Sequence, residues 1–113
     1  SKYCGVQHPL GEFEQLVMFA VMRLDEGAYG AAIRSELLER AGRDVSPGAI
    51  FTTLERLEAR GLVTSTYGEP TQERGGRRKR FYRVAPEGRR ALAASLETIR
   101  RMARGLELGE EQS

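Results

Sequence analysis

Apolar residues near the start of the chain recur at helical spacing. Between residues 12 and 25 they fall at i, i+3, i+4, i+7, i+8 and i+11, which is the spacing of one stripe along a helix. More apolar residues lie beside and behind this stripe, so we expect a second surface to cover that side of the helix. The stripe contains Phe13, Leu16, Val17, Ala20, Val21 and Leu24, and the additional residues are Met18, Phe19 and Met22.

Two further helices are predicted from their end signals. The second begins after Tyr29-Gly30 and closes at Gly42, since glycine favours the left-handed conformation that ends helices. The third begins at Ser46-Pro47, because serine can accept from free backbone N–H groups and proline suits the first helical position. The inward residues are expected to be Ile33, Leu37, Leu38 and Ala41 in the second helix and Ile50, Leu54 and Leu57 in the third. The residues expected to point elsewhere from the third helix are Thr52, Thr53, Glu55, Arg56 and Arg60.

The pattern then changes from helical to extended. Residues 62–67 and 81–84 are rich in β-branched and aromatic side chains, so we expect them to pair as a hairpin. Pro70, Gly75 and Gly76 lie between them and predict a long, solvent-facing tip.

A long last helix is predicted after Pro86. Its apolar residues are spaced 4, 3, 4 and 3 apart, which is a heptad seam of only two repeats. Because this seam is too short for a self-sufficient coiled coil, we expect it to pack on the first helix of a second copy, forming a homodimer. The expected dimerisation residues are Phe13, Phe19, Leu92, Leu96, Ile99, Ala103 and Leu106.

The 113 residues suffice for one domain with one core. The predicted fold is mainly α with a small β-hairpin: a winged helix-turn-helix with a long C-terminal dimerisation helix. Its expected parts are a flexible arm at 1–11, a DNA-binding domain at 12–85, the dimerisation helix at 86–108 and a disordered tail at 109–113. The longest apolar runs fall far short of the roughly 20 residues that cross a bilayer, so we expect a cytoplasmic protein with no membrane partner.

Charge is distributed unevenly, although the net charge is only +2. Residues 74–104 carry eleven basic and two acidic side chains, between two segments of net negative charge. A localised positive surface can displace counterions from phosphates, which indicates a polyanionic partner. The alternative interpretation is a polar face that is merely solvated.

The sequence argues against an enzyme. His8 and Cys4 are the single histidine and cysteine, and no phosphate-binding glycine loop follows a strand. Two ligands make an incomplete zinc site, so we expect neither a metal nor a cofactor. The role of Cys4 stays open between an ordinary thiol and a redox sensor.

A helix-turn-helix followed by a basic hairpin is typical of double-stranded DNA binding. The second helix of the pair lies in the major groove, where its polar side chains reach base edges, and its first turn can direct N–H groups at a phosphate. The basic hairpin would supply phosphate contacts. The expected DNA-binding residues are Ser46, Gly48, Thr52, Thr53, Arg56 and Arg60 of the third helix and Arg77, Arg78, Lys79 and Arg80 of the hairpin.

Four separated segments of the chain carry a resemblance: residues 29–33, 46–63, 75–84 and 87–88. In their order and spacing they resemble the PadR family of bacterial transcription regulators. The resemblance covers residues 12–106 and implies a winged-helix domain that dimerises through the C-terminal helix and usually represses transcription from a palindromic operator. The single last helix resembles the short subfamily.

Three positions depart from the family pattern. Phe51 replaces a common tyrosine and so lacks a hydroxyl for a phosphate contact. Glu55 would repel phosphates unless it accepts from a cytosine amine or pairs with Arg56 or Arg60. Ala85 stands where a threonine cap is frequent, which leaves Pro86 as the start signal of the last helix.

Two questions stay open from the sequence. A winged-helix module that binds proteins and not DNA is the alternative function, although it gives no reason for the basic block. A small-molecule effector is the other question, and no ligand is named. Its site could be lined by Tyr3, Phe13, Phe19 and Met102, which could equally serve core or dimer packing.

Overall fold

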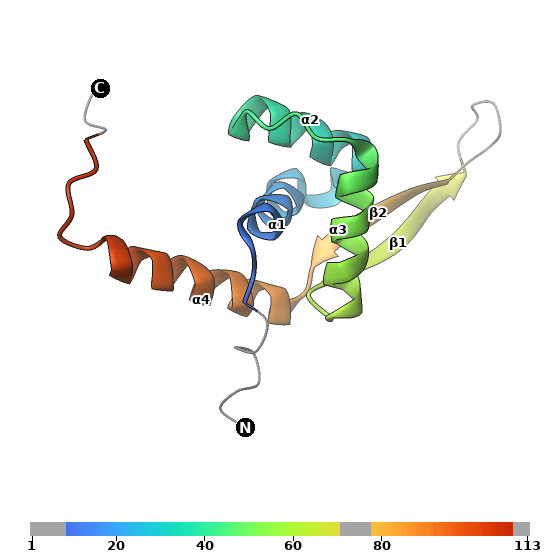
Figure 1. Cartoon of the computed structure of the whole chain (residues 1–113). Helices are drawn as coiled ribbons and strands as arrows, with labels where there is room; N and C mark the ends of the chain where they lie inside the picture. Colours follow the sequence, from blue (N-terminus) through green and yellow to red (C-terminus); the bar gives the residue numbers. More distant parts are fainter. Residues whose placement is uncertain (1–8, 71–77, 110–113) are drawn as a thin grey trace.

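The structure is a computed structural model that describes residues 9–70 and 78–109 (Figure 1). The predicted order of helices and hairpin is confirmed. The expected tail beyond residue 109 and the first eight residues of the expected arm lie outside the described residues. The elements are α1 (Glu12–Leu24), the 3-10 helix η1 (Asp25–Gly27), α2 (Gly30–Ala41), α3 (Pro47–Ala59), β1 (Val63–Pro70), β2 (Arg78–Val84) and α4 (Pro86–Ala103).

The core surrounds α1, which contacts α2, α3, β2 and α4. Val17, Met18 and Val21 are almost fully buried. Because Met18 lies in the chain's own core, this part of the surplus apolar surface needs no second copy. Leu10 is also buried, so the expectation of a flexible arm is wrong at this residue.

A tight turn joins α2 to α3. Gly42 adopts the left-handed conformation with φ 69°, and the Arg43 N–H donates to the Leu37 carbonyl at 3.0 Å. The Arg34 side chain holds the turn by donating to the Val45 carbonyl at 2.7 Å. Leu38 is exposed, contrary to the prediction, because it lies about 100° around the helix from the buried Leu37. Ala41, also predicted to face inward, is exposed as well.

The start and the inward face of α3 confirm the prediction. The Ala49 N–H donates to Ser46 Oγ at 3.1 Å, and Ile50, Leu54 and Leu57 are buried. Thr53 is a correction: it is 4% exposed, because it lies three residues after Ile50 and therefore on the same face.

The hairpin is antiparallel and longer than predicted. The register runs from Val63 opposite Val84 to Tyr67 opposite Arg80, and an irregularity precedes the pairing of Pro70 with Arg78. The Tyr82 N–H also donates to the Ala28 carbonyl at 2.8 Å. The segment between η1 and α2 is therefore attached to the edge of β2, a contact that periodicity did not predict.

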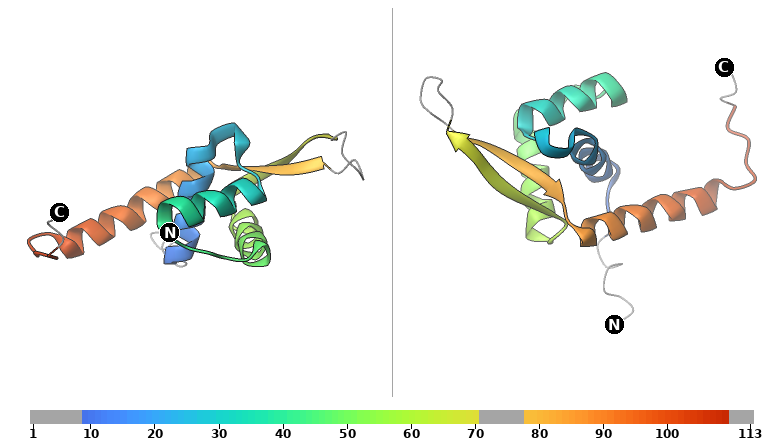
Figure 2. Two further views of the ribbon diagram at one scale, coloured as in Figure 1. Left: turned by 90° about the horizontal axis from the view of Figure 1, so that it is seen from above. Right: turned by 180° about the vertical axis from the view of Figure 1, so that it is seen from behind.

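The last helix divides into a packed part and a projecting part. Its first half lies against the core, and the rest extends away from the body on the side opposite the hairpin (Figures 1 and 2). Leu92 is only 4% exposed and belongs to the chain's own core, so its assignment to dimerisation is wrong. The helix ends at Ala103, five residues earlier than predicted, and Gly105 follows with φ 83°. Leu106 therefore lies beyond the helix.

Substituting Gly88 tests how closely α4 packs on the hairpin. A Cβ at Gly88 would overlap the Leu62 carbonyl oxygen and lie 2.9 Å from Val84 Cγ1. We expect Gly88→Ala to lower the free energy of unfolding by about 3 kcal/mol in chemical denaturation, because the backbone at Leu62 would have to move to make room for the methyl group. Gly30→Ala is the matched control, because nothing lies within 4 Å of its Cβ position. Equal effects of the two substitutions would contradict this packing.

Candidate nucleic-acid interface

The face of α3 opposite the core is exposed and polar. It carries Gly48, Thr52, Glu55 and Arg56. This presentation follows from the burial of Ile50, Leu54 and Leu57 on the other side, which fixes the rotation of the helix. Side chains on this face could reach base edges if the helix entered the major groove of DNA.

The first turn of α3 offers fewer donors than the sequence predicted. Pro47 has no N–H, the Ala49 N–H bonds to Ser46 Oγ, and the Ile50 N–H bonds to the Ser46 carbonyl. Within the described residues, the Gly48 N–H is thus the one donor of this turn left for a phosphate. Ser46 acts as the helix cap.

Two predicted DNA-binding residues are not on this face. Thr53 is buried, so its hydroxyl cannot reach a base. Arg60 lies at the other end of the helix and pairs with Glu14 of α1 at 3.7 Å. Thr52 and Arg56 remain as the candidate base-reading side chains.

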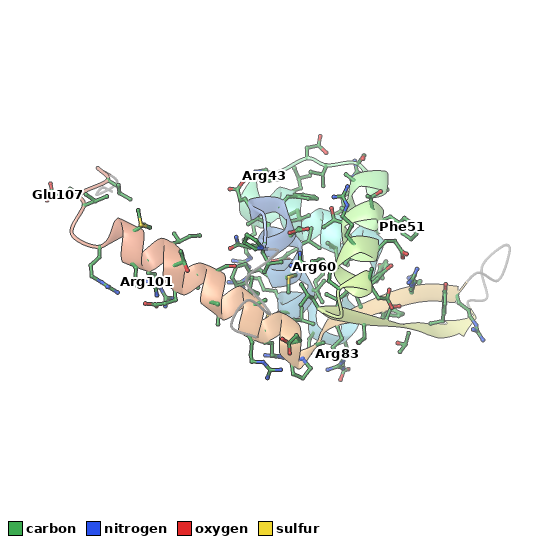
Figure 3. The ribbon with its side chains drawn as sticks, turned by 60° about the horizontal axis from the view of Figure 1, so that its bottom comes forward. Arg43, Phe51, Arg60, Arg83, Arg101 and Glu107 are labelled. Carbon is green, nitrogen blue, oxygen red and sulfur yellow. The ribbon has the colours of Figure 1, made fainter. Side chains whose placement is uncertain are left out.

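An apolar cleft of about 330 Å³ lies between the start of α2, α3 and β2. Phe51 is 51% exposed at this cleft and points outward from α3 (Figure 3). The Lys79 ammonium group lies 4.4 Å from the centroid of the Tyr29 ring. The cleft therefore combines apolar walls with a cation at its edge.

The basic residues of β2 have different environments. Arg78 and Lys79 are exposed, and neither has an ion-pair partner within the part of the chain that the structure describes. Both are therefore available to phosphate. Arg77, the other predicted contact, lies outside the described residues.

Arg80 points toward α3, where it meets two carboxylates. Its Nη1 lies 3.0 Å from Glu55 Oε2, and its Nη2 donates to Glu58 Oε1 at 2.8 Å. Its Nε donates to Ser65 Oγ at 3.1 Å, and this hydroxyl donates to Glu58 Oε2 at 2.9 Å. We call these four residues the Arg80 network. Glu55 thus has Arg80 as an ion-pair partner, which the alternatives considered from the sequence, a cytosine amine, Arg56 or Arg60, did not include.

Alternation along β2 could have indicated this role for Arg80. Side chains two residues apart face the same side of a strand, and Tyr82 and Val84 are both buried. Arg80 continues that inward series.

The environment of the network affects two titratable groups. Burial disfavours the charged form of the Arg80 guanidinium and by itself lowers its pKa. Tyr82, Glu55 and Glu58 outweigh this effect, so the pKa of Arg80 is raised and the side chain stays charged. Burial also raises the pKa of the Tyr82 phenol, and Arg80 opposes this change only in part.

The site offers no evident metal centre. Within residues 9–70 and 78–109, no cluster of three or more His, Cys, Asp or Glu side chains could hold an ion. Cys4 and His8 lie outside these residues. No helix in the same ranges is both long enough and apolar enough to cross a membrane.

Comparison with known proteins identifies the family. The transcriptional regulator PadR-like family matches residues 18–94, from the middle of α1 into α4. The chain belongs to the PadR-like family of transcriptional regulators. A protein of Mycobacterium tuberculosis, transcriptional regulator Rv3488, is 40% identical over 82 residues, which cover 71% of this chain and 70% of the relative. The resemblance inferred from the sequence is therefore confirmed, and the PadR-like chain is a regulator and not an enzyme.

Solved structures agree with this assignment. A PadR-like transcription factor from Bacteroides fragilis aligns with TM-score 0.70 and 22% identity, covering 80% of this chain and 82% of that one. A PadR family regulator from Eggerthella lenta aligns with TM-score 0.64 and 27% identity, covering 83% and 81%. The predicted winged-helix fold is confirmed, and fold and PadR-like family together support a DNA-binding regulator.

The raised pKa of Tyr82 predicts a loss of stability in alkali. The folded state favours the protonated phenol of Tyr82, which therefore contributes to the free energy of unfolding. This contribution is complete below the tyrosine pKa of the unfolded chain, near 10, and is lost as the pH rises through the pKa of the folded state. Chemical denaturation between pH 9 and 11 should show falling stability in the wild type and a shallower decline in Tyr82→Phe. Parallel curves for the two proteins would contradict the effect of burial.

Proposed function

We propose that this PadR-like protein is a sequence-specific double-stranded DNA-binding repressor that acts as a homodimer on a palindromic operator. The observation that carries the proposal is the exposed polar face of α3 beside a strand with two accessible cations. This arrangement suits a groove lined by phosphates, because one element can read bases while the other binds the backbone. Such a role places the protein with the DNA in the cytoplasm, and binding at a promoter would exclude polymerase.

Different residues have different tasks in this proposal. Thr52 and Arg56 would enter the major groove from α3, since a helix fits that groove and arginine can pair with guanine. The Gly48 N–H, Arg78 and Lys79 would bind phosphates, joined by Arg77. These contacts would orient the protein without reading sequence.

Unpartnered apolar residues support the dimer. Ile99 is 53% exposed and Met102 is 76% exposed on the projecting part of α4, while Phe19 of α1 is 36% exposed. A groove of about 430 Å³ lies beside Phe19, between α1 and α2. We infer that the projecting α4 packs on the first helix of a second copy, with Leu96 and Ala103 in the same seam. A two-fold dimer presents two α3 helices and so matches a palindrome.

Substitution in the α4 seam tests dimer formation. Ile99→Asp should convert the dimer to monomer at micromolar concentration in light scattering, because it places a charge in an apolar interface. Thr98→Asp is the matched control, since Thr98 is exposed on the adjacent side of the helix and should leave the dimer intact. A wild-type monomer, or equal effects of the two substitutions, would count against the proposed assembly.

The salt dependence of binding tests the phosphate contacts. Each contact removed lowers the slope of log affinity against log salt by about 0.9, so Arg78→Ala with Lys79→Ala should flatten it by up to about 3 to 4 units in a dimer. Binding to selected and random duplexes should weaken nearly equally, because phosphate carries no sequence information. The control is Arg89→Ala with Arg90→Ala, which removes the same charges from exposed positions on α4. An unchanged slope, or a loss of preference with affinity for random DNA retained, would contradict this role of the strand.

A further inference from the structure

Arg80 differs from its neighbours on β2 because each of its three guanidinium nitrogens has a partner within the chain. Its Nη1, Nη2 and Nε reach Glu55, Glu58 and Ser65, respectively. Only 26% of the side chain is exposed. Arg78 and Lys79, by contrast, are exposed and have no such carboxylate partners among the residues described.

The negative charge of Glu55 would oppose DNA binding, and Arg80 can neutralise it. Glu55 lies on the exposed face of α3, and 44% of its side chain is accessible. Glu58, one turn further along, adds a second carboxylate on the side toward β2. Two carboxylates beside the groove would repel phosphates, because like charges at short range disfavour approach.

We propose that Arg80 is a positioning residue that ties β2 to α3 and neutralises Glu55 and Glu58, and that it does not bind phosphate. The inference rests on the proposed DNA-binding function and assigns one strand cation to a task different from that of its neighbours. Arg80 keeps its carboxylate partners when DNA is bound.

The geometry favours retention of these partners. A phosphate that took the place of Glu55 or Glu58 on the guanidinium would leave that carboxylate unpaired beside a polyanion. The guanidinium carbon also lies 5.3 Å from the centroid of the Tyr82 ring and 5.9 Å from that of Tyr67. Both rings therefore lie within cation–π distance of the guanidinium, while Ser65 links it to Glu58 through a shared hydroxyl.

The same network sets the position of the strand cations. Ser65 lies on β1 and Arg80 on β2, and both bond to Glu58 of α3, so the network joins both strands to this helix. Lys79 and Arg78 lie one and two residues from this fixed point. Their distance from the face of α3 that carries Arg56 therefore depends on Arg80.

A charge-rescue experiment separates this role from phosphate binding. Four variants are compared with the wild type. Two are the single substitutions Arg80→Gln and Arg78→Gln, and the other two are triple variants in which each of these is combined with both Glu55→Gln and Glu58→Gln. Affinity is measured at one salt concentration for a duplex selected by the wild type from a random pool. Arg80→Gln should weaken binding about tenfold, because it leaves carboxylates unpaired at the interface.

The expected result is a rescue that depends on which arginine was removed. Adding the two glutamines should restore Arg80→Gln to within about threefold of the wild type, since the neutral side chains repel no phosphate, and the remaining difference reflects the missing tie between β2 and α3. Removing the two carboxylates also makes the net charge of the protein more positive, which by itself favours DNA binding. The two Arg78→Gln variants measure the size of this general effect. Equal gains in the two backgrounds would overturn the inference and make Arg80 an ordinary phosphate contact.

A measurement without DNA tests the network independently of the proposed function. In chemical denaturation, Arg80→Gln and Glu58→Gln should be non-additive, because each breaks the same contact, while Arg78→Gln and Glu58→Gln should be additive. Additivity in both pairs would overturn the tie between β2 and α3. A wild type that binds no duplex would overturn the proposed function and the neutralising role, while the unfolding result would still decide whether the tie exists.

Discussion

Burial of one side of α3 is the constraint on which the interface depends. Ile50, Leu54 and Leu57 are at most 1% exposed and pack with the buried stripe of α1. Because an interior packed at this density does not let a helix rotate, the opposite side must face outward. The accessible positions of Thr52 and Arg56 are therefore consequences of core packing and need no separate support.

The hairpin depends on the same core through its inner side. Val63, Tyr82 and Val84 are buried, and the Leu62 carbonyl accepts from the Ala85 N–H at 2.9 Å where α4 begins. The absence of a side chain at Gly88 lets α4 approach this point. The core thus fixes the base of the hairpin, and the Arg80 network extends the attachment toward its tip.

Helical periodicity and end signals predicted most of the fold from the sequence. The Ser46-Pro47 start and the Gly42 end are local chemistry, and the structure confirms both. Thr53 could not be separated from Thr52 in this way, because polarity does not reveal that a hydroxyl lies on the buried face. Leu92 was assigned to a partner for a related reason: a heptad spacing predicts which side of a helix is apolar, but not which molecule covers it.

Charge was the least reliable guide to individual site residues. The basic block predicts phosphate contacts for the hairpin as a whole, yet residues of equal charge at positions 78, 79 and 80 have different environments. Arg80 differs because tertiary contacts bring Glu55 and Glu58 to it, and these lie 25 and 22 residues earlier in the chain. Strand alternation predicts that Arg80 faces inward. That α3 lies beside β2 and brings Glu55 and Glu58 to Arg80 is a tertiary contact that only the folded structure shows.

The most direct measurement of sequence-specific binding is selection of duplexes from a random pool by the wild-type protein and by Arg56→Ala at one stated salt concentration. The wild type should enrich a palindrome whose half-sites lie about one helical turn, roughly 10 base pairs, apart, or a multiple of this. Arg56→Ala should retain the palindrome but lose preference at the same base pair of each half-site, at a cost of about 1 to 3 kcal/mol there. A pool that the wild type leaves without enrichment would contradict sequence-specific recognition by α3.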